Sequence, residues 1–415
     1  MRVVLYTGKG GVGKTTTAAA TAVCAARRGL HTLVASADAA HSLGDVLEQP
    51  LGPEPQLVLP GPAGRSGRKG PPGRPSGRRP EGRLEAIEVD ARVETERHWG
   101  AIHEYLFRIF RYQGIEDVVA EELALLPGAE ELTTLLAVKG WAEAGEYDLV
   151  VVDCAPTGSA LRLLTLPEVA RGTLRFLLRM QRALSAAVTP LARNLVPLPL
   201  PDSRVFRDAE DFVYQKLSGL RQLVSDPQTT TRLVVTPERM VIDEALRAHT
   251  DLALFELPCD AVVLNRLLPE AAAEEAYFED WARLQEERRR EVEQDFEPLP
   301  VLPAPLQDDE VTGLSRLAAH GDALFAKHQP ADVLCTAPRV RFETVAPGVR
   351  AHVPMPHAEP DAIDVVRVDG ALVITSGARR RSLPLPRPLH HFDLVAVRLE
   401  GGTLLADFAR EGAAS

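Results

Sequence analysis

The hydrophobic pattern at the start of the chain predicts a strand, a helix and a second strand. Short β-branched apolar runs cover residues 3–7 and 32–36, and an alanine-rich stretch typical of a helix covers residues 15–28 between them. Gly29 follows this stretch at the position where a glycine commonly ends a helix. The order indicates a βαβ unit, whose two strands run parallel because the helix returns the chain across the sheet.

Further apolar runs continue this alternation. With helical segments between them, they lie at residues 86–89, 148–153, 232–236, 261–265 and 299–302. Strands that are apolar on every residue are expected where helices cover both faces of a sheet. We therefore expect an α/β fold with a mostly parallel sheet flanked by helices over residues 1–330, with a helical subdomain at about residues 100–220.

The pattern changes after residue 330. Alternating polar and apolar positions appear at residues 362–368, 371–375, 393–399 and 403–408, the last two runs on either side of Gly401 and Gly402. Such runs predict a small all-β sandwich domain over residues 331–415. The alternative is that these strands extend the main sheet, but the βαβ alternation has ended here, which favours a separate domain.

One internal segment lacks the apolar residues that a core requires. Residues 61–83 are rich in Gly, Pro, Arg and Ser, and carry seven Lys or Arg against one acid, Glu81. This composition predicts a disordered basic loop. It is either a tether for an acidic partner or membrane surface, or a solvated insertion without a role.

Charge and cysteine usage exclude several classes of protein. The 415 residues carry a formal charge of −11, which argues against a general nucleic-acid binder. The four cysteines lie far apart without a CxxC pair, so neither a disulfide framework nor a zinc site is indicated. No apolar run approaches the ~18–20 residues of a membrane span, and a glycine loop stands where a signal peptide would begin. We expect a cytoplasmic protein with at most peripheral membrane contact.

The glycine loop after the first strand carries the strongest chemical signal. It fits the phosphate-loop pattern G-x-x-x-x-G-K-[ST], between a strand and a helix as that motif requires. Backbone N–H groups of such a loop converge on phosphates, Lys14 reaches the β and γ oxygens, and Thr15 offers its hydroxyl to Mg²⁺. The residues that we assign to nucleotide binding are Gly8, Lys9, Gly10, Gly11, Val12, Gly13, Lys14, Thr15 and Thr16. The fold is accordingly predicted to be that of a P-loop NTPase.

Lys9 is a second lysine, which an ordinary phosphate loop does not need. With it, the string GKGGVGKTT resembles the deviant-loop ATPases, a family that includes the nitrogenase iron protein, MinD-type ATPases, the arsenite-pump ATPase ArsA and the targeting factor for tail-anchored membrane proteins. The resemblance implies that the protein hydrolyses ATP with Mg²⁺, and that Lys9 crosses a homodimer interface to the partner's nucleotide. A solvated surface lysine is the alternative.

Two further strings resemble the switch regions of ArsA and the tail-anchor factor. Residues 36–45 are similar to switch I, although Ala37 and Ala39 depart from its S-T-D-P pattern. The resemblance implies that Asp45 orients the attacking water and that Asp38 lies near Mg²⁺. Asp38 is alternatively a helix cap. An apolar strand ends at Asp153, as expected of a metal-side carboxylate. Residues 153–164 then resemble switch II, with Cys154 and Ser159 in place of Thr and His.

The expected adenine site lies later in the chain. Asn265 ends a strand, where an amide presents both a donor and an acceptor to adenine; the alternative is a cap that forms a turn. Pro303, Pro305 and Leu306 resemble the family's adenine-covering loop, and residues 310–314 resemble the helix that follows.

Two apolar helical stretches are candidates for the parts of the protein that ATP hydrolysis repositions. Apolar residues recur at helical spacing over residues 102–110 and 177–195. In the resembling targeting factors, helices at these places line a groove for hydrophobic client segments, whereas ordinary core packing is the alternative. Residues 333–408 resemble the α-crystallin-like domain of bacterial ArsA-related ATPases, which favours a chaperone-like role. An arsenite-pump motor and a slow regulatory ATPase are the other two candidates; scattered cysteines and one phosphate loop weaken the pump.

Overall fold

The structure is a computed structural model. It describes residues 1–36, 42–60, 82–90, 129–154 and 215–410, apart from 347, 369 and 378, together with scattered positions between 93 and 111 and position 211. The chain folds into two compact units. The first consists of residues 1–89, 141–156 and 224–415, and the second of residues 90–140 and 157–223. The two apolar stripes, the switch residues Asp38 and Ser159, and most of the expected helical subdomain lie outside the described residues.

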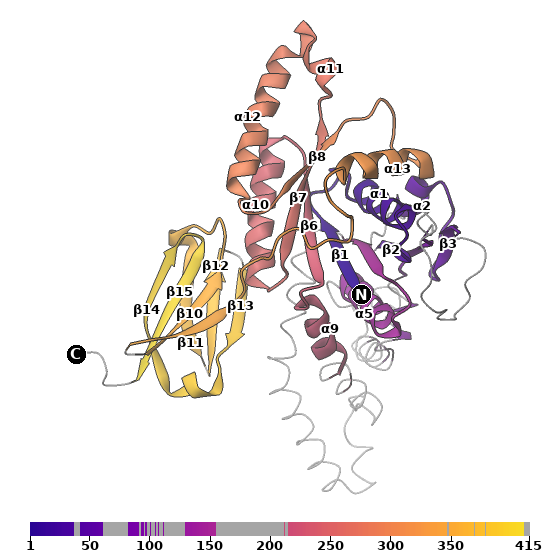
Figure 1. Ribbon diagram of the computed structural model, residues 1–415. Coiled ribbons are helices and arrows are strands. Elements are labelled where there is room, and N and C mark those ends of the chain that lie inside the picture. Colours follow the sequence, from indigo (N-terminus) through magenta and orange to yellow (C-terminus); the bar gives the residue numbers. More distant parts are fainter. Residues whose placement is uncertain are drawn as a thin grey trace, which may run out of the picture. The chain divides into compact units, whose positions relative to one another are not determined.

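An eight-stranded sheet forms the centre of the first unit (Figure 1). Its strand order is β3-β4-β2-β5-β1-β6-β7-β8, and all neighbours are parallel except the β3–β4 pair. The strands are β1 (Arg2–Thr7), β2 (Thr32–Ser36), β3 (Gln56–Leu59), β4 (Leu84–Glu88), β5 (Leu149–Asp153), β6 (Thr229–Val235), β7 (Cys259–Leu267) and β8 (Val301–Pro305). Parallel strands bring their carboxyl ends to one edge, where α/β proteins bind their ligands.

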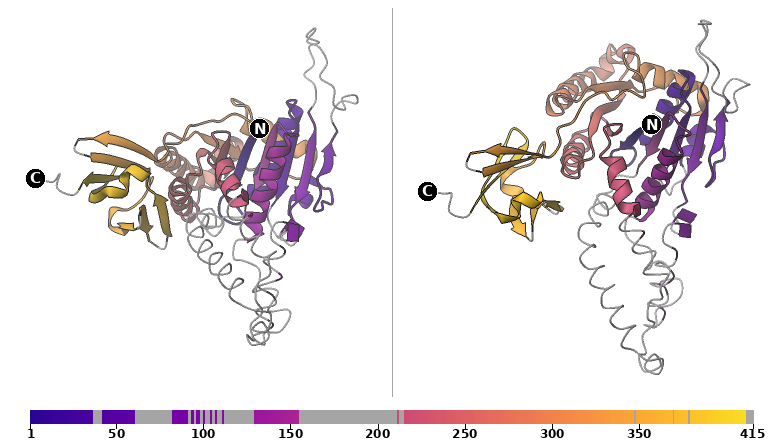
Figure 2. Two further views of the ribbon diagram at one scale, coloured as in Figure 1. Left: turned by 90° about the horizontal axis from the view of Figure 1, so that it is seen from below. Right: turned by 60° about the horizontal axis from the view of Figure 1, so that its bottom comes forward.

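Helices follow these strands in the βαβ manner. They are α1 (Lys14–Arg27), α2 (Ser42–Leu47), α5 (Ala129–Ala144), α9 (Leu217–Val224), α10 (Arg239–Leu254), α11 (Glu270–Ala273), α12 (Glu279–Asp295) and α13 (Gly313–Leu324), with a 3₁₀ turn, η3 (Ala276–Phe278), before α12. Helices α1 and α13 lie side by side (Figure 2). Gly321 allows their close approach, because a Cβ there would lie 2.5 Å from the carbonyl oxygen of Ala20.

The carboxyl-terminal region forms two antiparallel sheets that share one core. The first has the order β14-β15-β10-β9 and the second β11-β12-β13. Their strands are β9 (Arg341–Val345), β10 (Gly348–Pro354), β11 (Ile363–Val368), β12 (Ala371–Ser376), β13 (Arg379–Pro384), β14 (Phe392–Glu400) and β15 (Thr403–Arg410), with short 3₁₀ turns at Pro360–Ala362 and Arg387–His391. Buried side chains from both sheets meet between them, among them Val353, Ile374 and Phe408.

The expected fold class is confirmed in both parts. Every residue of β2 and β5 is buried, as the continuous apolar runs indicated. The sequence did not indicate the antiparallel edge strand β3, nor β9, β10 and β13 in the sandwich; β13 begins with three arginines. Among the described residues, no helix is both long and apolar enough to cross a membrane.

The end of the basic segment lies against the core. The N–H group of Gly82 donates to the carbonyl oxygen of Ala26 at 2.8 Å, and a Cβ at Gly82 would meet the Leu30 carbonyl oxygen. Arg83 accepts a hydrogen bond from the N–H group of Thr32. Residues 61–81 lie outside the described residues.

Candidate nucleotide site

The phosphate loop joins the carboxyl end of β1 to the start of α1. Gly8 and Gly13 have positive φ angles of 152° and 93°. A Cβ at Gly8 would lie 2.3 Å from the Val234 carbonyl oxygen, and one at Gly13 would lie 2.4 Å from the amide nitrogen of Asn265. Glycine is therefore required at both positions by the close approach of neighbouring strands. Helix α1 has no acidic residue in its first turn and no side-chain cap, so its N-terminus is suited to an anion.

The two loop lysines have different partners. The Nζ atom of Lys14 donates to the carbonyl oxygen of Lys9 at 3.2 Å, so this side chain lies over its own loop. The Nζ atom of Lys9 instead lies 3.6 Å from a carboxylate oxygen of Glu244 on α10. Both partners of this second pair are more than one-third exposed. Glu244 was not identified from the sequence, because nothing in its helix distinguishes it from other surface acids.

Three oxygen-bearing side chains meet at the start of α1. The hydroxyl of Thr15 donates to an Oδ atom of Asp153 at 2.5 Å and lies 3.3 Å from the hydroxyl of Ser42. Asp153 is 1 % exposed, at the carboxyl end of β5 beside β1. A carboxylate and two hydroxyls are hard oxygen ligands, so this set fits Mg²⁺. The structure brings together Thr15 and Asp153, as the sequence predicted, and adds Ser42.

The expected water-orienting residue lies on α2. Asp45 is exposed within this helix, which packs against α1. Its neighbour Gly44 donates its N–H group to a carboxylate oxygen of Glu88, at the end of β4, at 3.0 Å. The start of α2 is thereby tied to the sheet edge, while the role of Asp45 stays a prediction.

Asn265 lies within β7 and its side chain contacts the phosphate loop; the strand continues to Leu267 and does not end at Asn265 as the sequence indicated. Asn265 is 7 % exposed, and its Nδ2 atom donates to the carbonyl oxygen of Val12 at 2.8 Å. This donor already has a partner within the protein, so a contact with adenine stays a prediction. On the edge strand β8, Pro303 pairs in register with Leu264, next to Asn265. Leu306 follows Pro305 with 49 % of its surface exposed, and its N–H group donates to the carbonyl oxygen of Leu267.

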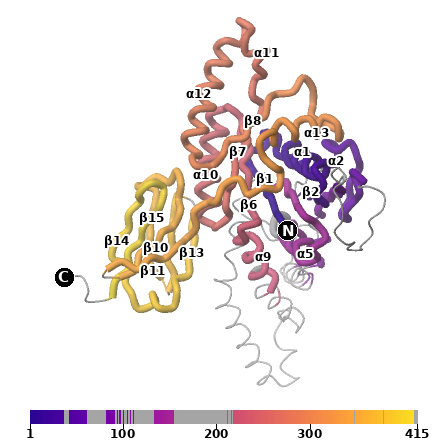
Figure 3. The backbone as a smooth tube through the Cα atoms, viewed as in Figure 1, coloured from indigo at the N-terminus to yellow at the C-terminus, as the bar shows by residue number. Residues whose placement is uncertain are grey.

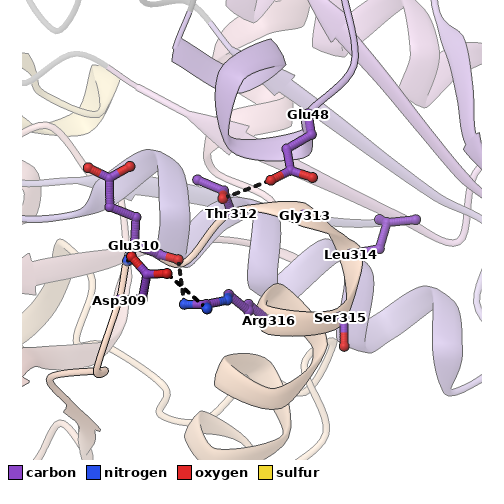
Figure 4. A pocket seen from close by; sticks show the side chains of 8 residues that line it. All are labelled: Glu48, Asp309, Glu310, Thr312, Gly313, Leu314, Ser315 and Arg316. Carbon is purple, nitrogen blue, oxygen red and sulfur yellow. Dashed lines mark hydrogen bonds and ion pairs between the residues drawn. The ribbon is translucent and has the colours of Figure 1, made fainter.

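A polar cavity of about 550 Å³ lies at the start of α13 (Figure 4). Its lining comes from the loop before α13, from the first turn of that helix and from Glu48, which follows α2. The Thr312 hydroxyl donates to Glu48 at 3.0 Å, and Arg316 pairs with Asp309 at 2.9 Å. The sequence pointed to residues 310–314 but not to Glu48.

A buried charge cluster lies at the opposite, amino-terminal edge of the sheet. Arg2 and Arg232 both pair with Asp260, at 2.8 and 3.1 Å, and none of the three is more than 4 % exposed. Burial lowers the pKa of Arg2 to about 10, although the negative charge of Asp260 acts to raise it. Both arginines also donate to backbone carbonyls of residues 330–332, where the chain passes from α13 towards the sandwich (Figure 3). The sequence analysis did not identify this cluster, although the charged residues inside its apolar strands are a signal that could have indicated it.

The sandwich contacts the end of α10 and the residues that follow it. Arg379 and Arg381 of β13 pair with Asp251 and Glu256, each at 2.8 Å. His249 on α10 lies 3.0 Å from His357, ring nitrogen to ring nitrogen. Burial is the main reason that the pKa of His249 falls to about 4.

The cysteines do not form a metal site in this part of the molecule. Cys24 and Cys259 are buried free thiols, and burial raises the pKa of both, to about 12 for Cys24. No group of three or more His, Cys, Asp or Glu side chains suited to a metal ion occurs within the described ranges.

Comparisons with known proteins agree with this geometry. A family model described as anion-transporting ATPase matches residues 1–61 and 78–326, and one described as an HSP20-like domain found in ArsA matches residues 348–408. A putative arsenical pump-driving ATPase 1 of Aquifex aeolicus is 30 % identical over 98 % of this chain and 99 % of its own. A putative arsenical pump-driving ATPase of Chlorobaculum tepidum is 33 % identical over 93 % and 90 %. The ATPase GET3A of Arabidopsis thaliana is 25 % identical over 80 % and 85 %.

The first family model covers most of the chain, including the phosphate loop, Asp153 and Asn265. The second covers most of the two antiparallel sheets. The chain therefore belongs to the anion-transporting ATPase family, with the HSP20-like domain found in ArsA at its carboxyl-terminal side.

Proposed function

We propose that the protein is a Mg²⁺-dependent ATPase that acts as a homodimer and couples ATP-driven closure to the binding of hydrophobic protein segments. The observation that carries the ATPase chemistry is the meeting of Thr15, Asp153 and Ser42 beside the phosphate loop. Mg²⁺ held there would neutralise charge on the β and γ phosphates. Lys14 and the N-terminus of α1 would bind the same phosphates, and Asp45 would orient the attacking water.

The dimer proposal is supported by the position of Lys9. Its ammonium group points to Glu244 on α10 rather than into its own loop, and the pair is partly exposed. Exposed ion pairs contribute at most ~1 kcal/mol, so a second subunit's nucleotide phosphates can take Lys9 away from Glu244. Lys9 would then reach the partner's nucleotide, where an added cation stabilises the charge that develops during phosphoryl transfer.

The client proposal is supported by the resemblance to targeting factors and by the HSP20-like domain. An arsenite-pump role is the second candidate, because several relatives bear the name arsenical pump-driving ATPase. The described thiols do not favour it, since arsenite needs clustered thiolates and burial keeps Cys24 and Cys259 protonated. A slow regulatory ATPase is the third candidate function. We place the protein in the cytoplasm, where free thiols persist.

Two measurements separate these candidates. Asp45→Asn should retain ATP binding and slow turnover by at least about a hundredfold, because only the water is misplaced. This ATP-locked form should then retain proteins with exposed apolar segments in a pull-down, whereas Lys14→Ala should not. Stimulation of wild-type ATPase by arsenite, together with no apolar client, would favour the pump and contradict the client proposal.

A further inference from the structure

A single glutamate joins the helix of switch I to the segment that follows the expected adenine loop. Glu48 follows α2 directly, and its Oε1 atom accepts a hydrogen bond from the Thr312 hydroxyl at 3.0 Å (Figure 4). The other carboxylate oxygen lies against the backbone at Gly313, where a Cβ would be 2.9 Å away. Gly313 also has a φ of +70°, so a side chain at this position would be both crowded and strained. The backbone of α13 thus begins in contact with the Glu48 carboxylate.

Local geometry on both sides of the hydrogen bond supports a specific contact between Glu48 and Thr312. Thr312 is the N-cap residue of α13, yet its side chain makes no capping bond to the helix and donates to Glu48 instead. Glu48 has a φ of 55°, in the left-handed region that residues other than glycine adopt at an energetic cost. A carboxylate at the N-terminus of α13 is stabilised by the helix dipole, which offsets part of that cost.

The contact connects two parts of the proposed nucleotide site. The N–H group of Glu48 donates to the carbonyl oxygen of Asp45, which places the expected water-orienting residue one turn away. At the other end of α2, Ser42 lies 3.3 Å from Thr15 of the phosphate loop. Thr312 follows Leu306 by only six residues, so it lies just beyond the expected adenine loop. Helix α2 therefore has a phosphate-side contact at its start and a base-side contact at its end.

We propose that Glu48 is a positioning residue that transmits occupancy of the adenine site to Asp45, through Thr312 and α2. The inference rests on the proposed ATPase function and deepens it, because it makes turnover depend on the base as well as on the triphosphate. Glu48 touches no phosphate-loop residue, so its loss should reduce kcat and leave ATP affinity unchanged. A purely structural role would lower both together or would lower stability.

The kinetic test compares Glu48→Gln with Thr312→Val and with a matched control. Thr312→Val removes the donor of the hydrogen bond, and Glu48→Gln replaces its charged acceptor by a weaker neutral one; both variants preserve shape. The control is Asp308→Asn, which removes a carboxylate of the same loop that lies exposed to solvent. We expect about a tenfold loss of kcat for ATP in either variant, an unchanged Kd for ATP, and no further loss in the double variant. Equal kcat values for Glu48→Gln and the control, or additive losses in the double variant, would overturn the proposal.

Hydrogen exchange with ADP tests the same coupling without hydrolysis. In the wild type, saturating ADP should slow exchange of amides in both α1 and α2; in Glu48→Gln only the α1 amides should respond, and Asp308→Asn should behave as the wild type. If ADP protects α1 but not α2 in the wild type, the coupling is wrong and nucleotide binding stands. If neither helix responds, the proposed nucleotide site itself fails, and the coupling falls with it.

Discussion

The two edges of the main sheet use charge in opposite ways. At the amino-terminal edge, Arg2, Arg232 and Asp260 are almost completely buried and hold one another at 2.8 and 3.1 Å. At the carboxyl-terminal edge, Lys9 and Glu244 lie 3.6 Å apart and are 35 % and 42 % exposed. The buried group fixes residues 330–332, which lead to the sandwich, because both arginines donate to their carbonyl oxygens. The Lys9–Glu244 pair is weak enough to separate. Charges that hold the structure together are buried beside their partners, whereas the Lys9–Glu244 pair, which would have to separate if Lys9 acts across a dimer interface, is partly exposed to water.

The largest expected effect is at the fixed edge. Asp260→Ala leaves two arginines buried without their counter-ion, and breaking one side of a buried ion pair typically costs about 3–5 kcal/mol. Urea denaturation should show this loss, while Glu244→Gln should change the free energy of unfolding by less than about 0.5 kcal/mol. Similar unfolding free energies for the two variants would remove the distinction between the edges.

The next effect is at the phosphate loop. Lys14→Ala should weaken ATP binding by about a hundredfold or more, because no neighbour can supply the lost charge to the phosphates. Since the hydrogen bond of the Lys14 side chain goes to its own loop, unfolding by urea should be nearly unchanged. Isothermal titration with ATP and Mg²⁺ checks the first expectation. Unchanged ATP affinity would contradict the assignment of this loop as the nucleotide site.

Buried histidines make the stability of the protein depend on pH. Burial lowers the pKa of His249 to about 4, and also lowers the pKa of His357 and of His320, whose ring nitrogens are buried without a partner among the described residues. With folded-state pKa values below the ordinary 6.5, stability is complete above pH 6.5 and is lost as the pH falls towards 4. Tm should drop by roughly 3–6 °C between pH 7 and pH 5.

A variant of one histidine sharpens this expectation. His320→Leu should reduce the pH dependence of Tm, because the leucine cannot take up a proton in the buried site between α13 and its neighbours. An identical pH dependence in the wild type and in His320→Leu would show that His320 does not contribute.

The smallest expected effect is at the movable pair. Glu244→Gln removes the partner that holds Lys9 on its own chain, so basal ATPase activity should rise by about two- to fivefold. Glu238→Gln, an exposed acid that precedes the same helix, is the matched control and should leave the rate unchanged. A fall in rate for Glu244→Gln would mean that Glu244 supports Lys9 in catalysis rather than restraining it.

Sequence reasoning succeeded where the signal is local. The phosphate loop is a single short string, and its glycines at 8 and 13 prove to be required by close contacts with Val234 and Asn265. The strand ending at Asp153 was also clear, because its apolar run is continuous and the acid follows directly. The fold class followed from the alternation of such runs.

The residues that were missed act through partners far away in the sequence. Arg2 and Asp260 are 258 positions apart, and Glu48 and Thr312 are 264 apart, so no spacing rule connects them. Strand β13 was missed because its three consecutive arginines do not alternate with apolar residues as in the other predicted strands, whereas Arg379 and Arg381 pair with Asp251 and Glu256. Charges inside a strand indicate a partner, but the sequence does not say which one.

The central claim is that Lys9 completes the nucleotide site of a second subunit, and mixing two inactive variants tests it most directly. Lys9→Ala subunits and Asp45→Asn subunits are each expected to be inactive as homodimers. In a mixed dimer, a Lys9 that acts across the interface leaves one site intact and the other doubly defective, so an equal mixture should recover about a quarter of wild-type ATPase activity. If the mixture stays as inactive as its components while light scattering shows mixed dimers, Lys9 acts within its own chain and the central claim is contradicted.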